Sequence, residues 1–255
     1  LGMTQVGGPL AEAVSWTSVT GLSLLIVILC ASVVQWIRAG GIRFMLGLHP
    51  AVSVAALLVI APQFPTAPAG EFRVGWVQGN GPTGYFDDKV PGDVLAAQTA
   101  ATVPLYGQPM DLLAWPEGGV DADPLSDPAA AEALDRVVRS AGAPLLMNAA
   151  TTRGDDVFNT SLLWTADPTG RQWHDKVNPV PFGEYVPDRW FYRMFAPDLI
   201  DLIQREYTPG TVTPAVDIGG VPVGLAICFD VIYDDVIRDG AQAGAQVYMF
   251  QTNNA

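Results

Sequence analysis

A long uncharged run near the start of the chain constrains its fold more than any other feature. No charged residue occurs from Val14 to Ile37, and the centre of the run, GLSLLIVILCASVVQW, is almost entirely apolar. On a helix, Trp16 and Trp36 would lie about 30 Å apart, at the two bilayer interfaces where aromatic rings gather. The basic residues follow this run, whereas those of a signal peptide precede it. The run therefore predicts a transmembrane helix over about 14–37.

A second uncharged stretch, over about 44–62, predicts a second transmembrane helix, with Pro50 favouring a kink or a late start. Residues 1–66 would then form a membrane region. Arg38 and Arg43 lie in the short loop between the two spans, so the positive-inside bias makes that loop cytoplasmic. The remainder of the chain would face the opposite side of the membrane, which in a bacterium is the outer face of the plasma membrane. The alternative is a buried helical hairpin in a soluble protein.

Composition narrows the class of protein. The formal net charge is −13, from 26 acidic and 13 basic residues, which argues against nucleic-acid binding because phosphate recognition needs concentrated Lys and Arg. Cys30 and Cys228 lie in very different contexts, so we expect two free thiols. Because the sequence starts without Met and stops directly after an apolar run, we expect it to be a piece of a longer chain.

The part after the Pro-rich stretch at 62–70 predicts an α/β domain over 71–255, truncated at its C-terminal end. Asp127 and Pro128 predict a helix start, and Gly142 predicts its end. Apolar, β-rich runs predict strands over 72–80, 143–151, 158–170, 221–229 and 245–252, with a second helix over 230–244.

Three segments carry residues that could perform chemistry. In LLAWPEGGV, Glu117 follows an apolar run and precedes two glycines. Lys176 and Glu184 lie in the proline-rich HDKVNPVPFGEYVPD, and Cys228 lies at the predicted junction of strand and helix in GLAICFD. Each residue alone has an ordinary structural interpretation as a turn carboxylate, a solvated ammonium or a small core residue. A thiol at a strand-to-helix junction can also gain from the helix dipole, which lowers its pKa.

Together these residues predict acyl transfer. Glu117 would remove the thiol proton, Cys228 would attack a carbonyl, and Lys176 with a backbone N–H would stabilise the oxyanion. A histidine-based triad is less favoured, because His49 falls in the second apolar stretch and His174 is expected in a loop. No spacing of His, Cys or carboxylates predicts a metal site.

The segments WPEGG, the lysine followed by PVPFGEYVP, and ICFD resemble, in order, the Glu-Lys-Cys segments of the nitrilase (carbon-nitrogen hydrolase) superfamily. The VPFGEYVP signature after membrane helices is similar to that of the bacterial apolipoprotein N-acyltransferases. The resemblance implies an α-β-β-α sandwich on the extracytoplasmic face of the plasma membrane, preceded by transmembrane helices. It also implies that earlier membrane helices and the last strands of the domain are missing from this sequence. Glu117, Lys176 and Cys228 would be catalytic, with Glu184, Phe229 and Asp230 in support.

The same resemblance implies the substrates. Cys228 would take an acyl chain from a phospholipid as a thioester and pass it to the α-amino group of a lipoprotein's diacylglyceryl-cysteine, with no cofactor. Two positions depart from the family pattern: Asp230 replaces the usual Glu, and Asn178-Pro179 replaces a frequent His-Leu. A membrane-tethered amidase or nitrilase with the same triad, and a non-catalytic membrane scaffold, stay open as alternatives.

Overall fold

The computed structural model describes residues 2–5, 7–8, 10–39, 51–56, 58–60, 62, 65, 67–82, 90–203 and 205–253. The chain divides into two compact units, Leu1–Ala69 and Gly70–Ala255.

The first unit is built on helix α1, Val14–Ala39, after two short 3-10 helices, η1 Gly2–Gln5 and η2 Ala11–Ala13. Among the described residues, one helix, Ala11–Arg38, is long and apolar enough to cross a membrane, with a mean hydropathy of 2.3. Residues 51–56 and 58–60 are helical as well, and Leu58 packs with Leu22 of α1. The predicted second span over 44–62 includes residues outside those described and stays a prediction.

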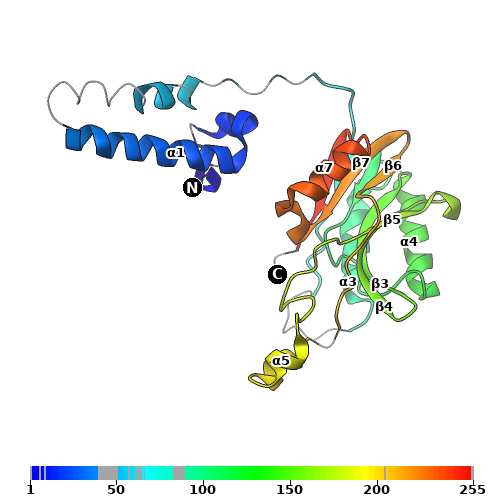
Figure 1. The fold of residues 1–255 in the computed structure, drawn as a ribbon. Coiled ribbons are helices and arrows are strands. Elements are labelled where there is room, and N and C mark those ends of the chain that lie inside the picture. The colour runs from blue at the N-terminus through cyan, green and yellow to red at the C-terminus, as the bar shows by residue number, and fades with distance from the viewer. Residues whose placement is uncertain are drawn as a thin grey trace. The chain divides into compact units, whose positions relative to one another are not determined.

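The second unit contains two β-sheets (Figure 1). The first sheet has the order β1-β2-β3-β4-β5, parallel from β1 to β3 and antiparallel from β3 to β5. Its strands are β1 Val74–Trp76, β2 Leu112–Ala114, β3 Leu145–Arg153, β4 Asp156–Trp164 and β5 Gln172–Asp175. The second sheet has the order β6-β7-β8, with β6 Ala215–Ile218 antiparallel and β8 Val247–Gln251 parallel to β7 Val221–Ile227.

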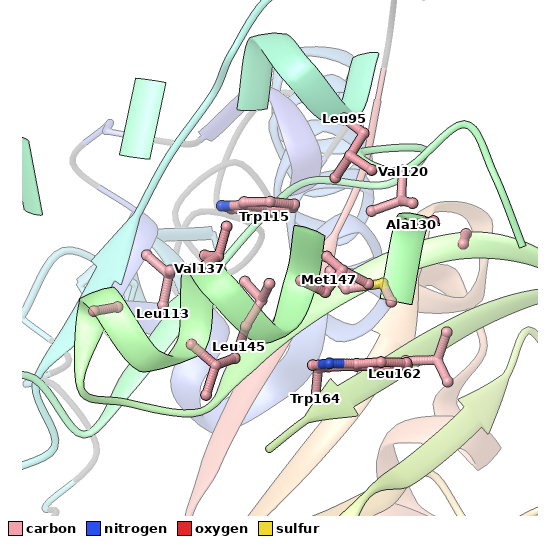
Figure 2. Close-up of a cluster of buried hydrophobic side chains, with 14 of the residues drawn as sticks. Leu95, Leu113, Trp115, Val120, Ala130, Val137, Leu145, Met147, Leu162 and Trp164 are labelled. Atoms are coloured by element: carbon pink, nitrogen blue, oxygen red, sulfur yellow. The ribbon is translucent and has the colours of Figure 1, made fainter. Parts of the chain in front are cut away.

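Side-chain alternation along the strands creates two apolar layers. Leu145, Met147 and Leu162 point away from the second sheet and pack with residues of α4, Pro128–Ala141, and of α3, Asp93–Thr102. Figure 2 shows this cluster, with Trp115 and Trp164 among its largest side chains.

The opposite face of the first sheet meets the second sheet. Leu112, Leu146 and Leu163 pack there with Val223 and Leu225 of β7. Helix α7, Asp234–Gln242, packs against β7. Helices on the outer faces of two facing sheets form the predicted α-β-β-α sandwich. The shorter helices are η3 Val103–Leu105, η4 Pro168–Gly170, α5 Arg189–Arg193, α6 Pro197–Ile200 and η5 Cys228–Ile232.

The capping prediction for α4 is confirmed. The Asp127 carboxylate accepts hydrogen bonds from the N–H groups of Ala129 and Ala130 at 2.8 and 3.3 Å, and Pro128 occupies the first helical position. Gly142 ends the helix with φ 70°, a left-handed conformation that glycine adopts at little cost.

Two predictions near the site were wrong. The helix expected from residue 230 begins at Asp234, and a five-residue 3-10 helix, η5, precedes it. His174, expected in a loop, lies in β5 and is fully buried. Burial lowers the pKa of its imidazole, and the negative charges of Asp230 and Asp175 oppose that effect.

Candidate active site

The ammonium of Lys176 lies between two carboxylates. Its Nζ donates to Oε1 of Glu117 at 3.3 Å and to Oε1 of Glu184 at 3.0 Å, and it lies 2.9 Å from Oε2 of Glu184. The Lys176 side chain is 1% exposed, whereas the Glu117 and Glu184 side chains are 13% and 16% exposed. The positive charge is thus shielded from water, and the two negative charges border an accessible space.

The protonation state of Lys176 follows from competing effects. Burial alone would lower the pKa of its amine. The negative charge of Glu117, the hydrogen bond and charge of Glu184, and a contribution from Cys228 all raise this pKa, and together they outweigh the effect of burial. The net pKa lies above the ordinary value of 10.5, so the side chain is an ammonium at neutral pH.

The segment that carries Lys176 and Glu184 is irregular, as predicted, and is fixed by hydrogen bonds. The Lys176 N–H donates to the carbonyl of Asn159 in β4, and its carbonyl accepts from the N–H of Gly210, both at 2.8 Å. The Glu184 carboxylate accepts from the N–H of Val180 at 2.8 Å, which closes a tight turn around the carboxylate. Hydrogen bonds to backbone groups therefore fix the main chain of Lys176 and the carboxylate of Glu184.

Cys228 directly follows β7 and begins η5, which agrees with its predicted position at the end of a strand. The helix that starts at Cys228 is a 3-10 helix of only five residues, so the expected support from the dipole of a full α-helix is absent from this part of the structure. Cys228 is half-buried and has φ 49°. A left-handed conformation is strained for a non-glycine residue, and such strain is typical of functional sites held by their surroundings.

Asp230 ties the cysteine turn to the lysine segment. Its fully buried carboxylate accepts hydrogen bonds from the N–H groups of Val177 and Asn178 at 3.2 and 2.8 Å, and from the side chain of Asn178 at 3.0 Å. It also lies 3.5 Å from the N–H of Ile227, just before the cysteine. Phe229 packs its ring edge-on against Tyr233 at 5.5 Å between centroids.

A cavity of about 800 Å³ brings the four principal candidates together, since Glu117, Lys176, Glu184 and Cys228 all line it. Several further lining residues were not predicted from the sequence: Asp121, Asp123, Asn148, Asn159, Arg205, Tyr207 and Asn253. Burial raises the pKa of Tyr207, so its hydroxyl stays protonated at neutral pH.

The backbone N–H of Asn253, two residues after β8, donates to Oε2 of Glu117 at 3.1 Å. Asn159 donates to Oε1 of the same carboxylate. The two oxygens of Glu117 are therefore held by different parts of the domain, one by strand β4 of the first sheet and one by the segment that follows the second sheet. No local sequence pattern gives these contacts, because they join residues 42 and 136 positions apart.

This arrangement is suited to chemistry at a carbonyl group. A carboxylate, an ammonium and a thiol border one space, and the ammonium is held close to the carboxylate without exposure to water. Proton removal, nucleophilic attack and oxyanion stabilisation need these three groups.

Residues 73–255 match the carbon-nitrogen hydrolase family. The chain belongs to this family. Its full length is 30% identical over 293 residues to the apolipoprotein N-acyltransferase of Mycolicibacterium smegmatis, of which it covers 46%. It is 28% identical over 282 residues to the apolipoprotein N-acyltransferase of Geobacter metallireducens, of which it covers 51%. The chain thus spans about half the length of the curated relatives it matches.

Solved structures of amidases share the fold of this carbon-nitrogen hydrolase domain. A double mutant of the amidase from Nesterenkonia sp. AN1 in complex with acrylamide has a TM-score of 0.52 and 18% sequence identity. The match covers 74% of this chain and 68% of the amidase chain. At this identity the similarity shows the fold alone, and it agrees with the sandwich described above.

Proposed function

We propose that the protein to which this chain belongs is an apolipoprotein N-acyltransferase. It would move an acyl chain from a membrane phospholipid to the α-amino group of a lipoprotein's N-terminal diacylglyceryl-cysteine. The observation that carries the proposal is the buried Lys176 ammonium, bonded to Glu117 and Glu184 beside the cavity that Cys228 also lines. The similarity to apolipoprotein N-acyltransferases over the full chain favours this acceptor.

In the first half-reaction, Glu117 takes the proton of the Cys228 thiol, and the thiolate attacks the ester carbonyl of the phospholipid. The oxyanion that forms is stabilised by the Lys176 ammonium. The carbon–oxygen bond of the ester then breaks, and Glu117 returns its proton to the leaving alkoxide. The products are a lysophospholipid and a thioester on Cys228.

In the second half-reaction, the neutral α-amino group of the acceptor attacks the thioester carbonyl. Glu117 takes a proton from the attacking nitrogen, Lys176 again stabilises the oxyanion, and the carbon–sulfur bond breaks. Cys228 leaves as a thiolate and recovers the proton from Glu117. Glu184 forms the second ion pair with Lys176 and holds the ammonium in place in both steps.

A phospholipid donor requires access to a bilayer. Helix α1 is long and apolar enough to provide a membrane anchor. The Arg38 and Arg43 side chains favour a cytoplasmic loop, so the hydrolase-like domain would act on the extracytoplasmic face.

An amidase that uses the same residues is the second candidate, because solved amidases share the fold. Both enzymes form an acyl-cysteine, and they differ in the acceptor, which is water for the amidase. The long apolar helix favours the transferase, since a soluble amide substrate does not require a membrane anchor. A non-catalytic scaffold is disfavoured by a buried ammonium that is kept beside two carboxylates.

Mass spectrometry of the full-length protein tests the proposal. After incubation with vesicles of dipalmitoyl phospholipid, the Cys228 peptide should gain the mass of one palmitoyl group. Adding a diacylglyceryl-cysteine peptide should remove the adduct and yield the palmitoylated amide. Loss of the adduct at the same rate without the peptide would favour the amidase, and no adduct on Cys228 would overturn both.

A further inference from the structure

The buried side chains of Asn148 and Asn159 form a series of hydrogen bonds that starts at the backbone next to Glu117 and ends at the Glu117 carboxylate. The N–H of Gly118 donates to Oδ1 of Asn148 at 2.7 Å. Nδ2 of Asn148 donates to Oδ1 of Asn159 at 2.8 Å. Nδ2 of Asn159 donates to Oε1 of Glu117 and to Oε1 of Glu184, both at 2.9 Å. The series thus begins at the residue after Glu117 and returns to Glu117.

The sheet register places both amides on the site face. Asn148 of β3 pairs with Ser161 of β4, so Asn159 is its diagonal neighbour, two residues along the same face. This is the face on which Leu146 and Leu163 meet the second sheet. The inner surface therefore changes from leucine to asparagine toward the cavity, and both amides are nearly inaccessible, at 2% and 6% exposed.

The direction of every bond in the series follows from its first donor. A backbone N–H can only donate, so Asn148 must turn its oxygen toward Gly118 and its NH2 group toward Asn159. Asn159 then accepts with its oxygen and has both of its N–H donors left for the carboxylates. The N–H of Gly118 therefore decides which end of the Asn159 amide faces Glu117 and Glu184. The two carboxylates meet the NH2 group of Asn159 and not its carbonyl oxygen.

Lys176 completes a ring of alternating donors and acceptors. Oε1 of Glu117 and Oε1 of Glu184 each accept from both Nζ of Lys176 and Nδ2 of Asn159. One ammonium faces two carboxylates, so the ring carries one excess negative charge. The amide donors offset part of the repulsion between the carboxylates without adding a titratable group.

We propose that Asn148 and Asn159 form a two-amide relay that orients and stabilises the ionised carboxylates of Glu117 and Glu184, which makes both asparagines positioning residues for the proton transfer at Cys228. This rests on the proposed role of Glu117 as the base. Oε1 of Glu117 accepts from two donors, whereas Oε2 accepts only from the N–H of Asn253 among the hydrogen bonds of the described residues. Oε2 therefore has a lone pair that can accept the thiol proton.

The other charged and titratable groups that line the cavity with the two carboxylates come from several elements. They are Lys176 after β5, Cys228 in η5, Arg205 and Tyr207 after α6, and Asp121 and Asp123 after β2. A change confined to the amides therefore reports on the relay only if these groups are kept, so the test alters the asparagines alone.

The decisive variant is Asn148→Asp, which touches neither carboxylate. A carboxylate there still accepts from Gly118 but cannot donate to Asn159, so Asn159 would turn its NH2 group toward it and its oxygen toward Glu117 and Glu184. An acceptor and an added negative charge near the ring both disfavour ionisation of the carboxylates and of the thiol. Asn159→Asp should act in the same direction from within the ring.

The measurement is the pH dependence of Cys228 alkylation by iodoacetamide in the full-length protein, read on the Cys228 peptide by mass spectrometry. In Asn148→Asp and Asn159→Asp, the rising limb of the alkylation rate plotted against pH should move to higher pH by about one unit. At a fixed pH below the limb, this shift corresponds to an about tenfold lower rate. Asn148→Ala, which removes the donor without adding charge, should lower the rate with a smaller shift. Gln98→Glu, at another buried amide that accepts from a backbone N–H, should leave the limb unchanged.

An unchanged limb in folded Asn148→Asp and Asn159→Asp would overturn the proposal. So would failure of both Asn148 variants to fold while Gln98→Glu folds, since the amides would then be structural. The proposed function is tested separately by the palmitoyl adduct. A shifted limb in the variants without any palmitoyl adduct in the wild type would reject the acyltransferase and support the relay. A palmitoyl adduct together with an unshifted limb would support the acyltransferase and reject the relay.

Discussion

Asn178 donates twice to one oxygen of Asp230, through its backbone N–H at 2.8 Å and through its side-chain amide at 3.0 Å. This contact joins the segment that carries Lys176 to the turn that carries Cys228. The resemblance noted in the sequence leads us to expect Glu at position 230 and frequently His at position 178, and both positions differ from that pattern. The two unusual residues contact each other, so the departures are coupled in this structure.

Asp230→Asn should destabilise the domain and misplace the nucleophile. An amide in place of the buried carboxylate weakens hydrogen bonds to a charged acceptor, each of which contributes about 1.5–3 kcal/mol. We expect the free energy of unfolding to fall by about 2 kcal/mol or more in urea titration, together with slower alkylation of Cys228. Asp217→Asn is the matched control, because exposed Asp217 accepts from the Gly220 N–H and should lose less than about 1 kcal/mol.

The sequence predicted helix α4 well because its signals are local. Asp127, Pro128 and Gly142 each act on backbone groups within a few residues. Strand β5 was missed because its four residues include His174 and Asp175, which look like surface residues in isolation. Asp175 is stabilised in the interior by Arg153 and Thr160, from strands that the sequence does not place beside it.

The site was predicted in part for the same reason. Glu117, Lys176 and Cys228 each follow a recognisable run, so their segments were visible in the sequence. Asn148 and Asn159 were not, because their shared face depends on the register between β3 and β4.

Lys176→Arg should fail nearly as badly as Lys176→Met in acyl transfer. The planar guanidinium keeps the charge but cannot occupy the place of a compact ammonium between two carboxylates. Loss of an oxyanion donor typically lowers kcat by about 10²–10³. Thioester formation on Cys228 should be measured by mass spectrometry in both variants.

The Met variant should also lose about 3–5 kcal/mol of stability, because Glu117 and Glu184 would be left without their cation. Arg136→Lys, in an exposed ion pair with Glu132, should change neither quantity. Wild-type rates in Lys176→Arg would contradict a role in oxyanion stabilisation.

The raised pKa of Lys176 also predicts alkaline sensitivity. An amine whose pKa is higher in the folded than in the unfolded protein contributes stability that is fully present below the ordinary value of 10.5. That stability is lost as the pH rises through the folded pKa. Urea midpoints between pH 9 and pH 12 should therefore fall more steeply in the wild type than in Lys176→Arg, whose guanidinium does not titrate in this range. Parallel curves would show that the folded and unfolded pKa values do not differ.

The orientation of the membrane unit can be tested in the full-length protein. Because Arg38 and Arg43 favour a cytoplasmic loop, an alkaline phosphatase fused after Gly70 should be active, since it would lie outside the cytoplasm. The same reporter fused at Gly40 should be inactive, and a cytoplasmic reporter at Gly40 should be active. The reverse pattern would place the domain in the cytoplasm and remove its access to exported lipoproteins.

Cys228 should show a conflict between function and stability. Its φ of 49° costs a side-chain-bearing residue about 1–2 kcal/mol, whereas glycine adopts this conformation readily at an entropic cost of about 0.5–1 kcal/mol. Cys228→Gly should therefore be up to about 1 kcal/mol more stable than Cys228→Ala in thermal unfolding, although both should form no acyl adduct. Ala226→Gly, two residues earlier in regular β7, should be destabilised instead. If Cys228→Gly were less stable than Cys228→Ala, the turn would not be strained, and its left-handed backbone would not be maintained for the thiol.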